Sequence, residues 1–242
     1  MDAISTTNLT KTYQDTVAVD GLNLTIRQGE LFSLLGTNGA GKTTALKMLA
    51  CLTTPTAGDA WIMGHSITGN RNDITKIIGV SPQETAIAPN LSVRENLELI
   101  CGIYGFTPAQ CREKVAALSG LFELTKVLSK KAGKLSGGWQ RRLSIAMALI
   151  GQPEILFLDE PTLGLDVLAR RSLWDIIRQL KGKITVILTT HYMEEAQALS
   201  DRIGVMKDGT LLTVGTAREL MDQTNTDKFE DAFIAIVGGV AP

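Results

Sequence analysis

Gly36-Thr37-Asn38-Gly39-Ala40-Gly41-Lys42-Thr43-Thr44 is the most informative run of residues in this chain. It fits the pattern G-x-x-x-x-G-K-T, which is typical of a phosphate-binding loop. Glycines let the backbone bend around an anion and expose successive N–H groups to it. Lys42 brings a positive charge to the outer phosphates, and Thr43 offers a hydroxyl group to Mg²⁺. A helix expected over about residues 41–50 would direct the positive end of its dipole at the phosphates.

The residues on either side of this loop fit the same interpretation. Leu31-Phe32-Ser33-Leu34-Leu35 is a short apolar run that suits a buried parallel strand. Ala45-Leu46-Lys47-Met48-Leu49-Ala50 contains good helix formers. A strand, a glycine loop and a helix thus follow each other in the order that the motif requires, which indicates a nucleoside triphosphate site. The alternative, a glycine-rich turn that binds nothing, is disfavoured by this context.

Composition limits the classes of protein to which the chain can belong. Of its 242 residues, 44% are hydrophobic and 20% are charged, so a buried core is expected and disorder is not. The net charge is −1 and the isoelectric point is near 6.2, whereas a protein that binds the backbone of nucleic acids is usually more basic. We therefore expect no nucleic acid as a partner.

Cysteine usage and hydropathy indicate a cellular compartment. Cys51, Cys101 and Cys111 are an odd set without CxxC spacing, which is typical of core residues in a reducing compartment. The start of the chain shows no secretory signal, and no apolar stretch approaches the roughly 18 residues needed to span a bilayer. We expect a soluble, cytoplasmic protein, for which another chain would supply any membrane crossing.

The segment before the phosphate-binding loop, residues 3–27, is expected to form antiparallel β structure. Leu22, Leu24 and Ile26 alternate with polar residues, which is the period of a half-buried strand. Tyr13 lies between the first strands of this segment. Its ring can stack on a nucleotide base, although an ordinary surface or core tyrosine is the more common case.

Polar side chains follow predicted buried strands at their carboxyl ends, where open α/β sheets place ligand contacts. Asp159 and Glu160 end the apolar run Ile155-Leu156-Phe157-Leu158, and two acids there are hard to explain as packing, because burying them is expensive. Asp159 can hold Mg²⁺, directly or through water, and Glu160 can accept a proton from an attacking water molecule. Gln83 and His191 each follow another such strand. A loop residue without a role explains Gln83 equally well. A lone histidine is usually structural, but the place of His191 at the carboxyl end of a strand favours a functional role.

From about residue 90 to residue 150 the pattern predicts helices and no strand. Ser92-Val93-Arg94-Glu95 is a capping box, and Thr107-Pro108 opens a further helix with proline at its first position. We interpret this block as an all-helical insert in an α/β domain.

Leu135-Ser136-Gly137-Gly138-Trp139 lies inside this insert. Ser136 is a good N-cap for the helix that follows, and an ordinary cap explains it. A cap does not explain the second glycine in the first turn, where it weakens the helix by about 1 kcal/mol. A hydroxyl group and two glycines at a helix N-terminus are therefore a candidate for a second anion site.

The last part of the chain predicts a hairpin and a helix. Residues 203–214 fit two strands turned by Asp208-Gly209. Apolar residues then recur at helical spacing, so the tail is expected to be an amphipathic helix packed on the body. A helix that fits the groove of a partner is the alternative. The apolar positions are Phe229, Ala232, Phe233, Ile236 and Val237.

Taken in order, these motifs resemble those of the ATP-binding subunit of ABC transporters over nearly the whole chain. Residues 36–43 are similar to Walker A, Leu135-Ser136-Gly137-Gly138 to the signature motif of the family, and residues 155–160 to Walker B with its catalytic glutamate. Gln83 matches the Q-loop glutamine, Gly164-Leu165-Asp166 matches the end of the D-loop, and His191 matches the switch histidine. Tyr13 falls where the family stacks an aromatic ring on adenine. Trp139 departs from the glutamine, and Gly164 from the alanine, that many members have.

The resemblance implies the fold and its division. The fold is α/β, a P-loop NTPase (RecA-like) mixed sheet with an N-terminal antiparallel β subdomain and an inserted all-helical subdomain. A single ABC ATPase domain would span residues 1–242. Within it, residues 1–89 and 151–220 would form the catalytic core, residues 90–150 the helical subdomain, and residues 221–242 a C-terminal helix.

The resemblance also implies a mechanism in which two copies meet head to tail with ATP and Mg²⁺ between them. Glu160 would be the general base, with His191 and Gln83 also at the reacting phosphate. Thr43, Gln83 and Asp159 would serve Mg²⁺. The other copy would supply Ser136 and Gly138 to the γ-phosphate. The nucleotide-binding set comprises Tyr13, Thr37, Asn38, Gly39, Ala40, Gly41, Lys42, Thr43, Thr44, Ser136, Gly138 and Asp166.

The implied partners are an integral-membrane permease and a second nucleotide-binding subunit, identical or closely related. The chain would then lie on the inner face of the cell membrane. Its closing Lys228-Phe229-Glu230-Asp231-Ala232-Phe233 looks like the tail of the subfamily that serves exporters, although a helix that only packs on the body is the plainer interpretation. One rival is a soluble ABC ATPase of DNA repair, cluster assembly or translation. Another is a regulator that binds nucleotide without hydrolysis, against which Glu160 argues.

Overall fold

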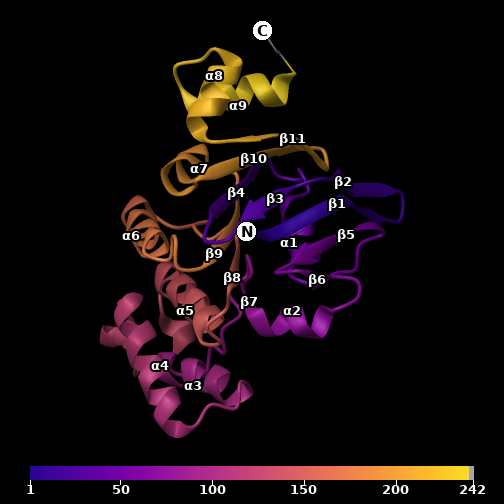
Figure 1. Cartoon of the computed structure of the whole chain (residues 1–242). Coiled ribbons are helices and arrows are strands. Elements are labelled where there is room, and N and C mark those ends of the chain that lie inside the picture. The colour runs from indigo at the N-terminus through magenta and orange to yellow at the C-terminus, as the bar shows by residue number, and fades with distance from the viewer. Residues whose placement is uncertain (240–242) are drawn as a thin grey trace.

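The computed structural model describes residues 1–239, in which two β-sheets enclose helix α1 (Lys42–Leu49) (Figure 1). The larger sheet has the strand order β11-β10-β4-β9-β8-β7 and is parallel except for the pair β10–β11. Its strands are β4 (Leu31–Gly36), β7 (Ile78–Ser81), β8 (Ile155–Asp159), β9 (Thr185–Thr190), β10 (Arg202–Lys207) and β11 (Thr210–Gly215).

The smaller sheet is antiparallel and has the order β2-β1-β5-β6, with β3 also paired to β1. Its strands are β1 (Asp2–Tyr13), β2 (Thr16–Leu22), β3 (Thr25–Arg27), β5 (Ala57–Ile62) and β6 (His65–Ser66). The antiparallel β structure expected before the phosphate-binding loop is therefore confirmed, and it pairs with β5 from beyond that loop.

The strands of the larger sheet are apolar throughout because both of its faces are covered. In β8, Leu156 and Leu158 belong to the hydrophobic cluster under the helices, whereas Ile155 and Phe157 belong to the cluster shared with α1. Alternate residues of a strand point to opposite faces, so a strand that is buried on both faces needs no polar position. This burial explains why the run before Asp159 reads as continuously hydrophobic.

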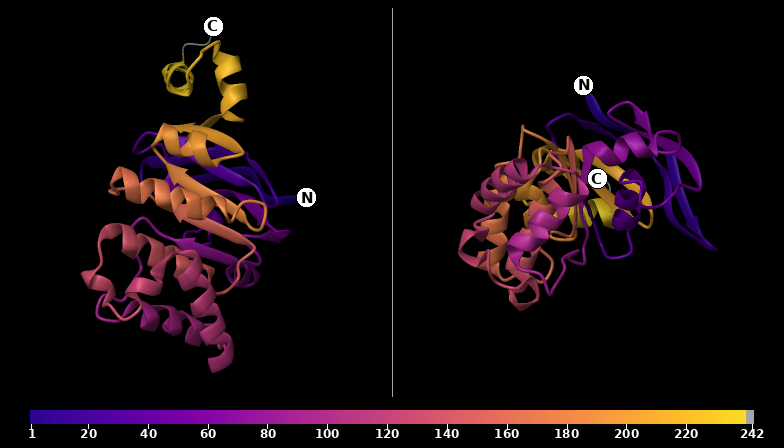
Figure 2. Two further views of the ribbon diagram at one scale, coloured as in Figure 1. Left: turned by 90° about the vertical axis from the view of Figure 1, so that its left-hand side faces the viewer. Right: turned by 90° about the horizontal axis from the view of Figure 1, so that it is seen from below.

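Helices cover the larger sheet and extend beyond it at both ends (Figures 1 and 2). In both figures, α3, α4 and the start of α5 lie at one end of the molecule, and α8 and α9 lie at the other. Besides α1, the helices are α2 (Arg71–Ile77), α3 (Val93–Ile103), α4 (Pro108–Leu121), α5 (Gly137–Leu149), α6 (Val167–Arg178), α7 (Met193–Leu199), α8 (Ala217–Thr224) and α9 (Phe229–Gly238). Short 3₁₀ turns span Leu124–Val127 and Ala132–Lys134.

The predicted capping signals of the helical block are confirmed. The Glu95 backbone N–H donates to Ser92 Oγ over 3.2 Å, and Glu95 Oε2 accepts from the Ser92 N–H over 2.7 Å. Thr107 and Gln110 make the same reciprocal pair at the start of α4. Each box satisfies backbone donors that the first turn of a helix leaves without partners.

The C-terminal part contains the predicted hairpin but more than the predicted helix. Asp208 and Gly209 have φ of 47° and 82°, which is the backbone conformation of a tight hairpin turn. The expectation of one helix over residues 221–242 is wrong, because α8 already begins at Ala217 and Asn225, with φ of 52°, ends it in the left-handed conformation. The last residues of that expected helix, 240–242, lie outside the described residues.

Neighbouring strands place the polar strand-end residues at one edge of the larger sheet. Leu35 of β4 is paired with Thr190 of β9, and Asp159 of β8 with Thr189. The carboxyl ends of β4, β8 and β9 therefore meet, and the loops that leave them lie beside one another. This edge is where an open parallel sheet binds its ligands.

Candidate active site

A cavity of about 490 Å³ opens at this edge of the sheet. The phosphate-binding loop forms its floor, β2 contributes one wall, and Gln83, Glu160 and His191 come from the ends of the neighbouring strands. Its lining residues are Thr16, Val17, Ala18, Asn38, Gly39, Ala40, Gly41, Lys42, Thr43, Thr44, Gln83, Glu160, Leu163 and His191. Four of these residues, Thr16, Val17, Ala18 and Leu163, carry no motif by which they could be predicted.

The loop needs its glycines for two different reasons. Gly39 and Gly41 have φ of 83° and 94°, a region that side chains rarely adopt. At Gly36 the obstacle is space, since a Cβ atom there would lie 2.4 Å from the carbonyl oxygen of Met206. Gly41 is also the N-cap of α1, and within the described residues no side chain caps that helix end. The first N–H groups of α1 are thus available to an anion.

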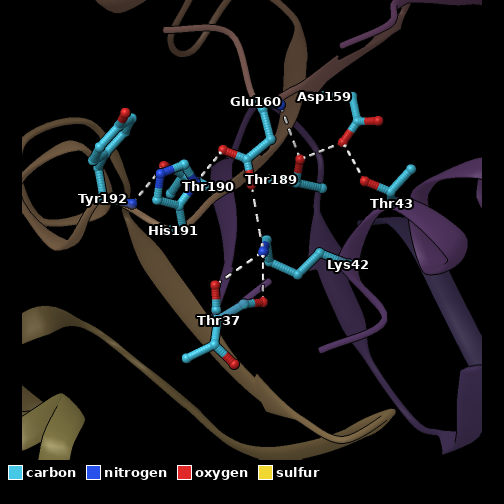
Figure 3. Close-up of polar contacts among 10 residues, drawn as sticks. Thr37, Lys42, Thr43, Asp159, Glu160, Thr189, Thr190, His191 and Tyr192 are labelled. Carbon is cyan, nitrogen blue, oxygen red and sulfur yellow. Dashed lines mark hydrogen bonds and ion pairs between the residues drawn. The ribbon is translucent and has the colours of Figure 1, made fainter. Parts of the chain in front are cut away.

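Lys42 is a buried cation held by its own loop (Figure 3). Its Nζ donates to the carbonyl oxygens of Gly36 over 2.9 Å and Thr37 over 3.1 Å. It also lies 3.4 Å from Glu160 Oε1. Thr37 therefore contributes through its backbone, without lining the cavity. This anchoring fixes a positive charge where the outer phosphates of a nucleotide would lie.

Asp159, Thr43 and Thr189 form a group of oxygen atoms beside the loop (Figure 3). Asp159 Oδ1 accepts from Thr43 Oγ1 over 2.9 Å and from Thr189 Oγ1 over 2.6 Å. Asp159 is only 3% exposed, so the two hydroxyl groups compensate for the loss of solvent.

This oxygen group fits Mg²⁺ better than a softer metal. Among residues 1–239, no cluster of three or more His, Cys, Asp or Glu side chains could hold a metal ion by itself. Mg²⁺ commonly binds through one or two protein oxygens, with water and substrate phosphates completing its shell. Thr43 and Asp159 supply such oxygens, and Gln83 lies on the same cavity.

Glu160 is held between Lys42 and His191 (Figure 3). Its Oε2 lies 2.7 Å from His191 Nδ1, and its backbone N–H donates to Thr189 O over 3.2 Å and to Thr189 Oγ1 over 3.0 Å. Its φ of 47° is unusual for a side chain of this size, and such backbone strain clusters at functional sites. The turn aims a carboxylate from the end of β8 into the cavity.

Tyr13, Ser136, Gly138 and Asp166 do not line this cavity in the part of the chain that the structure describes. Tyr13 ends β1 rather than lying in a loop, and 47% of it is exposed. Asp166 is the N-cap of α6, where its Oδ1 accepts from the N–H groups of Leu168 and Ala169. Within the described part of one chain, the cavity is therefore formed without these four residues.

Ser136 holds the expected N-cap position of α5 without acting as a cap. Its side chain is exposed and, within residues 1–239, accepts no cap hydrogen bond from the helix. Gly138 follows in the first turn of the same helix. The N-terminus of α5 thus keeps a hydroxyl group and its first N–H groups available, as an anion site requires.

A buried carboxyl group that the sequence did not reveal lies behind the cavity wall. Glu195 of α7 has no exposed surface, and its Oε1 accepts from Trp174 Nε1 over 3.0 Å. Burial raises the pKa of Glu195 from its ordinary value of 4.5, and the hydroxyl groups of Thr190 and Thr162 oppose that shift together with Trp174. Trp174 thereby connects α6 to the first turn of the helix after His191.

Comparison with known proteins gives consistent matches. The model of the family "ABC transporter" matches residues 19–163. Nod factor export ATP-binding protein I of Burkholderia thailandensis is 42% identical over 214 residues, which cover 88% of this chain and 70% of that protein. Daunorubicin/doxorubicin resistance ATP-binding protein DrrA of Streptomyces peucetius is 41% identical over 219 residues, which cover 90% of this chain and 66% of that protein.

A longer relative and two solved structures add to this picture. ABC transporter A family member 11 of Arabidopsis thaliana is 45% identical over 91% of this chain, which spans only 23% of that protein. An ATP-binding cassette solved as a dimer in a post-hydrolysis state with ADP and Pi gives a TM-score of 0.79 at 30% identity, covering 88% of this chain and 98% of that one. An ATP-binding subunit of an ABC transporter gives 0.86 at 24% identity, covering 97% and 99%, and shows the fold alone. None of the helices within residues 1–239 has the length and hydropathy of a bilayer-spanning segment.

Proposed function

Because this chain belongs to the ABC transporter family, we propose that it hydrolyses ATP and that hydrolysis powers export through a separate membrane permease. One observation carries the catalytic part of this proposal. The carboxylate of Glu160 contacts both the phosphate-loop cation Lys42 and His191 on the wall of one cavity. A base, a cation and a phosphate-binding loop in contact are the parts that phosphoryl transfer to water needs.

Binding of the triphosphate comes first in the proposed mechanism. The N–H groups of the loop and of the first turn of α1 bind the phosphates, and Lys42 neutralises their outer charge. Thr43 and Asp159 would hold Mg²⁺, with Gln83 on the same cavity. When bound, the metal supplies positive charge for the oxygens of the bond that breaks.

Hydrolysis then depends on the residues at the strand ends. Glu160 accepts a proton from the attacking water molecule, and His191 moves from Glu160 to the γ-phosphate. Both groups are already on the cavity wall, so the change needs only side-chain movement around Glu160.

A second copy of the chain, or a close relative of it, completes the proposed site. Ser136 and Gly138 of one subunit bind the γ-phosphate held by the other, and Asp166 lies at the same contact. Two observations support this arrangement: the exposed hydroxyl of Ser136 makes no cap bond within the described residues, and the similar cassette with ADP and Pi is a dimer. Opposed helix N-termini would neutralise a concentrated negative charge, which hydrolysis then removes.

We assign the division of the chain on the same basis. Residues 1–89 and 151–220 are the core that binds ATP, and residues 90–150 are the helical subdomain that presents Ser136 and passes its movement to the permease. Residues 217–238 contain the C-terminal helices α8 and α9, so the second core segment ends at residue 216 instead of residue 220. Peripheral attachment to the cytoplasmic face of the membrane follows from binding to the permease.

Export is favoured over import by the names of two relatives, a Nod factor export protein and a daunorubicin/doxorubicin resistance protein. A soluble ABC ATPase of repair, cluster assembly or translation is not favoured by these matches. Mg²⁺-dependent phosphate release by the purified chain tests the catalytic proposal, and co-purification from membranes tests the partner. A chain that releases no phosphate, alone or with membranes, would contradict the first, and recovery only on RNA or DNA would contradict the second.

A further inference from the structure

Arg141 lies on α5, the helix whose N-cap residue is Ser136. It is almost fully buried and contacts the loop that carries Gln83. Only 5% of the residue is exposed. Its Nη1 donates to the carbonyl oxygen of Pro82 over 2.6 Å, and its Nη2 donates to the carbonyl oxygen of Gln83 over 2.5 Å. The planar fork of a guanidinium group can bind two successive carbonyls at once, which fixes their orientation as well as their distance.

A second contact holds the same two segments together. Ser144 follows Arg141 by one turn on α5, and its Oγ lies 2.9 Å from Oγ of Ser81, with both residues buried. Three successive residues of the strand end, Ser81, Pro82 and Gln83, are therefore bonded to one face of α5. Because three successive residues of the loop are bonded to the same helix, we expect movement of the loop to displace α5 with it.

The positive charge of Arg141 also interacts with acidic side chains near the site. Burial lowers the pKa of its guanidinium, whereas the nearby carboxylates of Asp159 and Glu195 raise it. Arg141 thus adds positive charge near two buried acids, Asp159 and Glu195. A neutral residue without this fork would leave the carbonyl groups of Pro82 and Gln83 without these two donors, and the two acids without this cation.

We propose that Arg141 is a positioning residue that couples the two nucleotide sites to which one chain contributes. Gln83 lines the chain's own cavity, while Ser136 begins the helix that serves the partner's site, an assignment that rests on the proposed function. Arg141 joins them through the backbone of Gln83 on one side and α5 on the other. A phosphate that moves the loop of Gln83 in one site thereby repositions Ser136 at the other.

The test separates turnover from nucleotide binding. Arg141 makes no hydrogen bond or ion pair to the phosphate-binding loop within the described residues, so Arg141→Gln should change the KM for ATP by less than about threefold while lowering kcat about tenfold or more. In a double-mutant cycle with Gln83→Ala, the two losses in kcat should be clearly less than multiplicative, because both substitutions disable one connection.

Arg202→Gln is the matched control. Arg202 is half-buried and also donates to a backbone carbonyl, that of Thr25 over 2.8 Å, and to the carboxylate of Glu30. It lies at the start of β10 and does not line the cavity. The Arg202→Gln substitution should lower the melting temperature of the protein without lowering its kcat. Arg141→Lys, which keeps the charge but not the fork, should give a kcat between those of wild type and Arg141→Gln, and it replaces the latter where that variant does not fold.

The proposal is overturned if kcat is unchanged in folded Arg141→Gln or Arg141→Lys, if the losses multiply fully with that of Gln83→Ala, or if Arg202→Gln loses the same fraction of kcat. A wild-type chain that does not hydrolyse ATP contradicts the proposed function instead. The two failures are therefore distinguishable.

Discussion

Glu160 and His191 are in direct contact, with Oε2 of the carboxylate 2.7 Å from Nδ1 of the imidazole. The other oxygen of Glu160 lies 3.4 Å from Lys42 Nζ. Both partners of Glu160 are groups that we assign to the γ-phosphate. An incoming triphosphate would compete for Lys42 and His191, and would leave the carboxylate free to accept a proton from water. Binding of the substrate would thus activate the base.

Glu160→Gln tests the role of this carboxylate. Glutamine keeps the shape and can still accept a hydrogen bond from His191, but it cannot take up the proton of the attacking water. We expect kcat to fall at least about 10²-fold, while ATP still binds. In the presence of ATP, the Glu160→Gln variant should also accumulate as a dimer, which would be visible as a shift in size-exclusion chromatography. Wild-type turnover together with no added dimer would contradict the assignment.

Asp159→Asn tests the proposed Mg²⁺ site. Asparagine can keep the hydrogen bonds from Thr43 and Thr189 but removes the negative charge that binds the metal. Because a bound metal contributes several kcal/mol to the transition state, turnover should fall at least about a hundredfold. Binding of ATP measured in EDTA should change little. Asp175→Asn, which removes an exposed acid paired with Arg178, is the matched control and should leave both quantities unchanged.

Tyr13→Ala tests whether this exposed ring stacks on adenine. Tyr13 ends β1, close in sequence to the residues of β2 that line the cavity, and 47% of it is exposed. Stacking on a base contributes about 1–3 kcal/mol, so Tyr13→Ala should weaken ATP binding at least about fivefold. Tyr13→Phe should bind ATP normally, since it keeps the ring. If the wild type and both variants bind ATP with equal affinity, Tyr13 is an ordinary surface residue.

Glu195→Gln tests the cost of the buried carboxyl group through its dependence on pH. A raised pKa means that the folded chain favours the neutral acid, so this carboxyl group weakens the fold as pH rises above the ordinary value of 4.5. Glutamine can keep the bond from Trp174 without ionising. The unfolding free energy of Glu195→Gln should therefore rise relative to wild type between about pH 4.5 and 8, as denaturant titrations at several pH values would show. A constant difference across that range would mean that Glu195 is ionised without penalty.

The sequence was sufficient for the elements whose burial or end signals are local. Strands β8 and β9 are buried on both faces and read as apolar runs, and the capping boxes of α3 and α4 need only four residues each. Three short helices, α2, α7 and α8, were not predicted. Helix α2 buries only Ile74, and one of the few residues that α7 buries is the charged Glu195, so neither shows a clear apolar period. In α8 the apolar residues Ala217, Leu220 and Met221 do recur at helical spacing, but the helix has only eight residues.

The dependence on local signals also explains which candidate functional residues the sequence revealed. The loop, Asp159 and Glu160 form contiguous patterns, so their types and order suffice. Arg141 and Glu195 were not found, because the burial of a charge depends on partners from other elements, here the loop at Gln83 and Trp174 of α6. The role that we propose for Ser136 requires a second subunit, which one chain does not contain.

Mixing two defective variants tests most directly whether one chain completes the ATP site of another. Lys42→Ala should lack ATP binding, and Ser136→Ala should bind ATP and keep its stability within about 0.5 kcal/mol, because Ser136 makes no cap bond in the described residues. Each alone should be nearly inactive. In a one-to-one mixture, half of the dimers pair an intact loop with an intact Ser136 at one of their two sites, so turnover should recover to about a quarter of the wild-type value. Full activity of Ser136→Ala alone, or a mixture no more active than its components, would contradict the account.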